Sequence, residues 1–143
     1  MTHRTVRTIV AQQSPVTVTS RTSVHAAARL MRRQKVGAVL VVDDARLVGI
    51  FTERDALFRV LAEKRDAHTT RVATVMTPEP RSIHPDQPFA MALVMMYEGG
   101  FRHVPVVEDG RPLGMVSARD ALDPELDEFG VEMLHRERLA QIM

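Results

Sequence analysis

The chain has 143 residues, and its 19 basic and 18 acidic side chains leave a formal net charge of +1. This balance argues against a protein that binds nucleic acid through a strong basic field. Cysteine is absent, which excludes disulfides and thiol chemistry. The N-terminus has no signal-type apolar block, and no apolar run approaches the roughly 18 residues of a membrane span. We therefore expect a cytoplasmic protein that contacts neither membrane nor nucleic acid.

The sequence consists of one unit written twice. Residues 49–55 (Gly-Ile-Phe-Thr-Glu-Arg-Asp) return 65 positions later as residues 114–120 (Gly-Met-Val-Ser-Ala-Arg-Asp). The same offset pairs further residues without a gap, namely Pro15 with Pro80, Ala27 with Ala92, Met31 with Met96, Val39 with Val104 and Arg46 with Arg111. Because halves of about 65 residues are marginally stable alone, we expect one compact body in which the two copies share apolar surface.

The first copy predicts strands and helices in a regular order. Before residue 14 we expect only one apolar turn that packs on the body. Residues 16–18 alternate like a short strand, and Thr22 or Ser23 then caps a helix with apolar residues at helical spacing. Two apolar strands follow at 38–42 and 47–51 around a polar turn. After the heptad we expect a long helix whose apolar side holds Ala56, Leu57, Val60 and Leu61.

The second copy repeats this order. Residues 82–83 match the short strand, and a helix follows with Pro88 near its first position. A hairpin is expected over 104–107 and 113–116, and the helix after the second heptad is cut short at Asp123-Pro124. Residues 124–143 predict an appended helix with one broad apolar face. That face needs a partner surface, either on its own body or, slightly favoured, on a second subunit.

Each heptad places a hydroxyl and a carboxylate where a strand meets a helix. Free backbone N–H groups at a helix start favour an anion, and a carboxylate accepts hydrogen bonds from the vicinal hydroxyls of a ribose. The pattern would therefore suit a nucleotide. Thr-x-x-Asp and Ser-x-x-Asp also form capping boxes that bind nothing. Capping alone does not require the upstream glycine, or Arg54 and Arg119 beside the aspartates, and both interpretations can hold together.

The pattern resembles the cystathionine-beta-synthase (CBS) domain, present here as a tandem pair like that of stand-alone bacterial CBS proteins. The resemblance covers roughly residues 9–122 and rests on three motifs: the two heptads, the run Arg-His-Val-Pro-Val-Val at 102–107, and Val-Met-Thr at 75–77. It implies an α+β fold with two β-α-β-β-α repeats packed sheet to sheet about a pseudo-twofold axis. We expect repeat 1 at 8–65, a linker at 66–72, repeat 2 at 73–123 and the appended helix at 124–143.

The resemblance also implies two clefts between the repeats that bind adenine nucleotides. Asp55 and Asp120 would take the ribose hydroxyls, while Thr52 and Ser117 would face the ribose-phosphate region, with Arg54 and Arg119 beside them. Arg102 and His103 sit where the family often places basic side chains toward phosphate. Their counterparts Gly37 and Ala38 carry no charge, so the Asp120 cleft is expected to be the better equipped. Val16 and Val18 would line the Asp120 cleft, and Ile83 the Asp55 cleft.

We therefore expect a regulatory sensor of AMP, ADP, ATP or an NAD-type ligand. It would form a homodimer, act in trans on an unknown regulated protein, and need no metal or catalytic cofactor. The alternative is an oligomerisation or scaffold module with vestigial clefts. Catalysis is disfavoured because the six histidines form no His-x-x-x-His pattern and no Gly-x-Ser-x-Gly nucleophile is present, so we name no catalytic residue.

Overall fold

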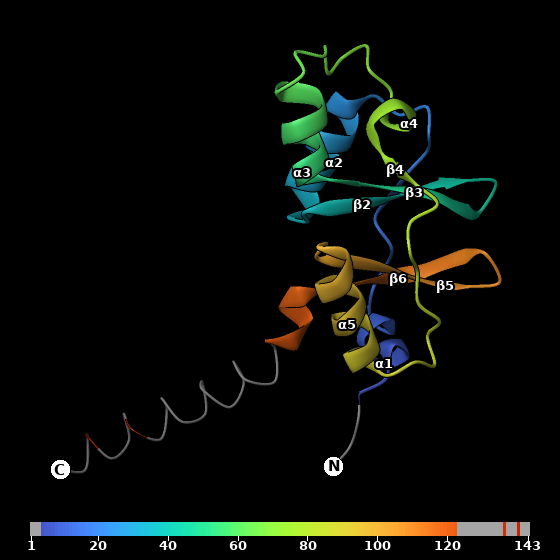
Figure 1. Ribbon diagram of the computed structural model, residues 1–143, viewed down its shortest axis with the longest axis vertical. Coiled ribbons are helices and arrows are strands. Elements are labelled where there is room, and N and C mark those ends of the chain that lie inside the picture. The colour runs from blue at the N-terminus through green and yellow to red at the C-terminus, as the bar shows by residue number, and fades with distance from the viewer. Residues whose placement is uncertain (1–3, 123–135, 137–139, 141–143) are drawn as a thin grey trace.

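The computed structural model of the protein describes residues 4–122, Arg136 and Ala140. The appended helix expected over 124–143 lies outside the described residues, apart from Arg136 and Ala140. The described part is an α+β structure with two halves stacked on each other. Each half has a β-hairpin on the inner side, and the two hairpins face each other across the middle of the molecule, with helices outside them (Figure 1).

The first half consists of helix α2 (Val24–Gln34) and a four-stranded sheet, in which the strands β1 (Thr17–Val18), β2 (Ala38–Asp43), β3 (Arg46–Thr52) and β4 (Thr77–Pro78) lie side by side in that order. Strand β1 runs parallel to β2, whereas β2–β3 and β3–β4 are antiparallel. Helix α2 begins where Ser23 Oγ accepts the Ala26 N–H at 3.1 Å, as the sequence predicts.

The second half repeats the register of the first. It contains α5 (Phe89–Gly99), β5 (His103–Glu108) and β6 (Arg111–Ser117). The pairing of Ala38 with Thr52 returns as His103 with Ser117, and each hairpin has its irregularity at the equivalent place. The β1–β2 pairing returns as a single parallel bridge between Ile83 and Val106. The 65-residue repeat in sequence is therefore a repeat in hydrogen bonding.

The two halves exchange the segments that precede them. Helix α1 (Val6–Val10) buries Val6 and Val10 in the core of the second half, among Phe89 and Val104. Helix α4 (Val72–Val75) buries its valines in the core of the first half. Figure 1 shows the same exchange, with α1 beside α5 and α4 beside the first sheet. Neither half has a complete core without chain from the other.

A third apolar cluster lies between the two sheets. Ala38, Leu40 and Ile50 are buried there, and Met115 of β6 packs against them from the other half. The hairpin turns also meet, because the Leu47 N–H donates to the Gly110 carbonyl at 3.0 Å. We call this contact zone between the halves the seam.

The helices after the heptads differ from the expectation in the first half. Helix α3 (Glu53–Asp55) continues as a π-helix, η1 (Ala56–Leu61), whereas η2 (Ala118–Ala121) is a short 3₁₀ helix. The predicted common face was wrong, since Val60 is 5% exposed but Leu57 and Leu61 are 51% and 70% exposed. Hydrogen bonding between residues five apart, as from Ala62 N to Leu57 O, gives more residues per turn than an α-helix has, so successive side chains are separated by a smaller angle and the α-helical face is not kept.

The described helices include none that is both long enough and apolar enough to cross a bilayer.

Candidate functional site

Both heptads form the capping boxes that their sequence permits. The Thr52 N–H donates to Asp55 Oδ2 at 2.9 Å, and the Asp55 N–H donates to Thr52 Oγ1 at 3.2 Å. In the second copy the Ser117 N–H donates to Asp120 Oδ2 at 2.7 Å, and the reciprocal bond is also present. Each aspartate thus stabilises its own helix start with one carboxylate oxygen. The other oxygen of Asp55 lies 3.5 Å from Arg59 Nε.

The heptad glycines have a packing role that the sequence does not reveal. A β-carbon at Gly114 would lie 2.9 Å from Val10 Cβ, and one at Gly49 would overlap the Met76 side chain. Val10 and Met76 belong to the segments that the halves exchange. The glycines therefore make room for these segments, and their presence in both copies does not by itself indicate a ligand.

A cleft of about 720 Å³ opens beside the first heptad, and we call it the Asp55 cleft. Asp55 and Thr52 lie in its wall, and Asp55 is only 7% exposed. Basic side chains from both copies line it, namely the guanidinium groups of Arg54, Arg59, Arg81 and Arg102 and the imidazole of His103. Leu57, Phe58 and Phe101 add apolar surface. The cleft therefore combines the carboxylates of Glu53, Asp55 and Glu79 with a hydroxyl, several cations and apolar walls.

The matching hollow beside the second heptad, the Asp120 cleft, is smaller, with a volume of about 270 Å³. Ser117, Arg119 and Asp120 line one side of it. The other side comes from the first copy, through residues Pro15, Val16, Lys35, Val36, Gly37 and Ala38 among others. His103 also borders this cleft. Both heptad carboxylates thus lie at hollows along the seam rather than in open solvent.

The lining residues of the two clefts correspond to each other at the 65-residue offset of the repeat. This correspondence shows which cleft holds more cationic side chains. Each cleft joins the heptad of one copy to the beginnings of strands in the other. Arg81, Arg102 and His103 consequently line the Asp55 cleft, where the Asp120 cleft has Val16, Gly37 and Ala38. The Asp55 cleft is the better equipped with cations, contrary to the sequence-based expectation.

Two of the three expected wall residues lie elsewhere. Val16 does line the Asp120 cleft. Val18 is 9% exposed and packs in the first core, whereas Ile83 is 5% exposed and packs in the second. Each packs in the core cluster of its own half together with buried residues of the neighbouring helix, α2 for Val18 and α5 for Ile83. The position that faces the Asp55 cleft is Arg81, the repeat counterpart of Val16.

His103 stands at the meeting point of the two copies. A β-carbon at Gly37 would lie 3.0 Å from Glu53 Oε1 and 3.6 Å from His103 Cε1, so both side chains converge on this glycine. Burial lowers the pKa of His103, and Arg102 lowers it further, while the carboxylates of Glu53 and Asp120 oppose the shift. The imidazole is consequently held in its neutral form at pH 7, with one N–H to donate.

A central groove of about 700 Å³ lies between the two clefts. It shares Arg102 and His103 with the Asp55 cleft, and Ser117, Arg119 and His103 with the Asp120 cleft. Among the three hollows, His103 is common to all. Sequence reasoning named His103 as a phosphate contact but did not foresee that both clefts use it, because this depends on how the copies pack.

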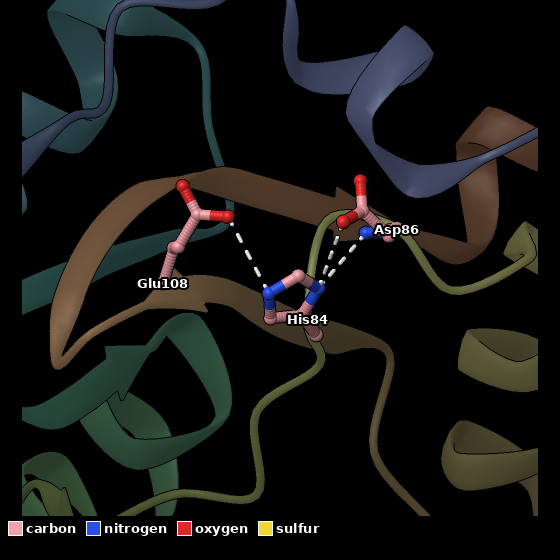
Figure 2. A group of neighbouring side chains, drawn as sticks. All are labelled: His84, Asp86 and Glu108. Atoms are coloured by element: carbon pink, nitrogen blue, oxygen red, sulfur yellow. Dashed lines mark hydrogen bonds and ion pairs between the residues drawn. The ribbon is translucent and has the colours of Figure 1, made fainter.

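A second group of titratable side chains lies away from the clefts, at the edge of the second half. Figure 2 shows His84 between Asp86 and Glu108. His84 Nδ1 accepts the Asp86 N–H at 3.1 Å, and Nε2 lies 3.4 Å from Glu108 Oε2. Arg7 of α1 forms ion pairs with both carboxylates, at 3.0 and 3.2 Å. This network fastens α1 to the second half, and its carboxylates already have a cationic partner.

Comparison with known proteins assigns the architecture to a family. The family model of the CBS domain matches residues 6–62 and again residues 72–125. The chain therefore belongs to the CBS domain family and carries two such domains in tandem. Such pairs are regulatory modules.

Individual relatives agree with this assignment. A mitochondrial CBS domain-containing protein of Arabidopsis thaliana, CBSX3, is 32% identical over 125 residues, which is 84% of this chain and 58% of that protein. A solved CBS-domain protein of Burkholderia ambifaria MC40-6 is 32% identical with a TM-score of 0.80, covering 87% of this chain and 95% of that one.

The CBS pair of protein MJ0100 has been solved in complex with 5′-methylthioadenosine and S-adenosyl-L-methionine. It is 26% identical with a TM-score of 0.77, and the match covers 92% of this chain and 99% of that one. The first curated relatives are longer proteins, of which this chain spans 15%, 58% and 20%.

Proposed function

We propose that the protein is a regulatory module that binds an adenine nucleotide between its two CBS repeats. The observation that carries the proposal is the Asp55 cleft, in which a carboxylate and a hydroxyl lie beside several cationic side chains in a hollow of about 720 Å³. A carboxylate suits ribose hydroxyls, and guanidinium groups suit phosphate. A cavity of this size falls in the range of small-molecule and cofactor sites.

The residues take distinct roles in this proposal. Asp55 and Asp120 accept hydrogen bonds from ribose with the carboxylate oxygen that the capping box leaves over. Thr52 and Ser117 face the sugar-phosphate junction, next to Arg54 and Arg119. Arg102 and His103, joined by Arg81, contact phosphate. Leu57, Phe58 and Phe101 offer apolar surface for adenine.

The ligand class is an adenine nucleotide such as AMP, ADP, ATP or an NAD-type dinucleotide. The adenosine derivatives bound by the MJ0100 pair support the adenosine part of this assignment. The cations of the Asp55 cleft support the phosphate part.

The module acts in trans on a regulated protein and is not an enzyme. Ligand binding would shift its packing only as far as two conformations differ in affinity. We place it in the cytoplasm as a homodimer. Self-association is supported by large apolar side chains exposed on the helices, namely Leu57, Phe58 and Leu61 on η1 and Met91, Val94 and Tyr97 on α5. Native mass spectrometry would report both the copurified ligand and the number of subunits.

Calorimetric titration with AMP, ADP, ATP and NAD tests the proposal. Asp55→Asn and Asp120→Asn keep an oxygen for the cap but remove the charge that accepts from ribose. Each is expected to weaken the best ligand of its own cleft at least tenfold, about 1.4 kcal/mol. Asp86→Asn, at an exposed position outside the clefts, is the control and should leave affinity unchanged. Unchanged affinity in both cleft variants would reject the ribose role.

The alternative is a scaffold whose clefts are vestigial. It is favoured by one specific observation, that both heptads already form complete capping boxes without a ligand. It predicts stable self-association together with no thermal shift from any adenine nucleotide. A shift of the unfolding midpoint by one of these ligands, lost in Asp55→Asn, would decide against it.

A further inference from the structure

The arrangement of cations along the seam suggests that the two clefts are not independent. The Asp55 cleft has Arg54, Arg59, Arg81 and Arg102, whereas the Asp120 cleft has Lys35 and Arg119. One cationic or protonatable group borders both, and that group is His103. Position 38, its counterpart in the first copy, is alanine, so the seam contains one imidazole where a symmetric pair would contain two.

His103 is held in place by both copies. Its backbone begins β5 and pairs with Ser117, the hydroxyl residue of the second heptad. Its side chain approaches Gly37 and Glu53, which is the first residue of α3 next to Thr52. The same imidazole therefore borders the clefts beside both heptads.

A single neutral imidazole can donate one hydrogen bond. If His103 donates its N–H to a phosphate in the Asp55 cleft, Lys35 and Arg119 are the cations left among the described residues of the Asp120 cleft to balance a second phosphate. Two phosphate groups on either side of one side chain also repel each other in a partly buried place, where charges are weakly screened. A nucleoside without phosphate meets neither obstacle.

We infer that the two clefts share His103 as their phosphate donor, so that a phosphorylated nucleotide in the Asp55 cleft weakens the binding of a second phosphorylated nucleotide in the Asp120 cleft. The inference rests on the proposed nucleotide-binding function. It specifies the regulation: the chain holds one phosphorylated nucleotide tightly and a second one weakly, while an unphosphorylated nucleoside can fill the second cleft without this penalty.

The test is calorimetric titration of the full chain with ADP and, separately, with adenosine, which differs from ADP only in lacking phosphate. The decisive variant is Arg81→Glu, because Arg81 is exposed and lines the Asp55 cleft alone among the three hollows. It should weaken the first ADP site at least tenfold. The second ADP site is the Asp120 cleft, identified as the site that Asp120→Asn weakens. Arg81→Glu should strengthen ADP binding there at least threefold, since the Asp55 cleft is then empty.

Arg29→Glu is the matched charge reversal, at an exposed position of α2 that lines none of the three hollows. It should change neither site. Arg54→Glu repeats the test at a second exposed residue of the Asp55 cleft, should Arg81→Glu fail to fold. His103→Ala should weaken the first ADP site and reduce the effect of Arg81→Glu on the second to less than twofold.

The outcomes separate two kinds of failure. If neither ADP nor adenosine binds, the proposed nucleotide function is wrong and this inference falls with it. If ADP binds at two sites and Arg81→Glu leaves the second site unchanged, the nucleotide function stands and the coupling is rejected. The coupling is also rejected if adenosine shows the same antagonism as ADP, or if only one site exists for both ligands.

Discussion

Gly114 illustrates how a residue of the heptad serves contacts between distant segments. Its missing side chain leaves space for Val10 and Gln13, which lie at the start of the first repeat in sequence but pack on the second hairpin. The Gln13 side chain accepts the Met115 N–H at 3.1 Å, in the place that β4 takes beside β3. The glycine is therefore explained by packing before any ligand is considered.

We predict that Gly114→Ala lowers the free energy of unfolding by about 1–3 kcal/mol, the usual cost of overpacking. The added β-carbon would lie 2.9 Å from Val10 Cβ, and that atom cannot move without moving α1. Gly37→Ala is the control, because its β-carbon meets the Glu53 carboxylate, which can rotate away. Urea denaturation measures both variants. Equal losses would contradict the packing explanation.

At the scale of elements, α1 and α4 each pack in the half opposite to the repeat that they begin. Helix α1 begins the first repeat and packs in the second half, whereas α4 begins the second repeat and packs in the first half. Val6 and Val72 are both fully buried, Val6 in the second core and Val72 in the first. Because the two cores are otherwise separate, a loss of packing in one core should lower the local stability of that half before it affects the other half.

We predict that Val6→Ala and Val72→Ala each cost about 2 kcal/mol, from lost burial and the cavity left behind. Hydrogen exchange should locate the damage. Val6→Ala should speed exchange in α5 and β5, and Val72→Ala in α2 and β2. Each variant serves as the control for the other. Faster exchange confined to α2 and β2 in Val6→Ala, and to α5 and β5 in Val72→Ala, would show that the segments are not exchanged in solution.

The helix after the first heptad shows where periodicity misleads. Its apolar residues fit an α-helical face, yet the chain forms a π-helix, and Leu57 and Phe58 line the Asp55 cleft while Val60 enters the core. The same residue types were visible in the sequence. What was not visible is the hydrogen-bond pattern, which decides the direction of each side chain.

At the scale of the whole molecule, the exchange of segments determines which piece of chain could fold alone. Residues 14–79 contain the complete first core, including α4 and β4, whereas residues 1–65 lack Val72 and Val75. A domain of this size is marginal even with its core complete.

We predict that a fragment of residues 14–79 shows cooperative thermal unfolding by circular dichroism, whereas a fragment of residues 1–65, cut at the sequence repeat, does not. The fragment of residues 14–79 exposes Ala38, Leu40 and Ile50 of the seam and should self-associate through them. Both fragments have about the same length, so size alone predicts no difference. Cooperative unfolding of 1–65 with loss of it in 14–79 would refute the assignment of the cores.

The sequence by itself determined the duplication, the order of strands and helices, the two hairpins and the residue types of the heptads. These follow from local patterns, since strand alternation, helix caps and turn residues act over a few positions. The 65-residue period predicted one body made of two copies, and the resemblance to CBS domains implied the α+β fold. The heptads named Asp55 and Asp120, which the structure places at two hollows on the seam.

Only the tertiary structure decided which residues meet across the seam. It placed Arg81, Arg102 and His103 with Asp55 and moved Val18 and Ile83 into the cores. It also exchanged α1 and α4 between the halves. The physical reason is that each repeat completes its core and its cleft with chain from the other copy, and such long-range contacts leave no local pattern in the sequence.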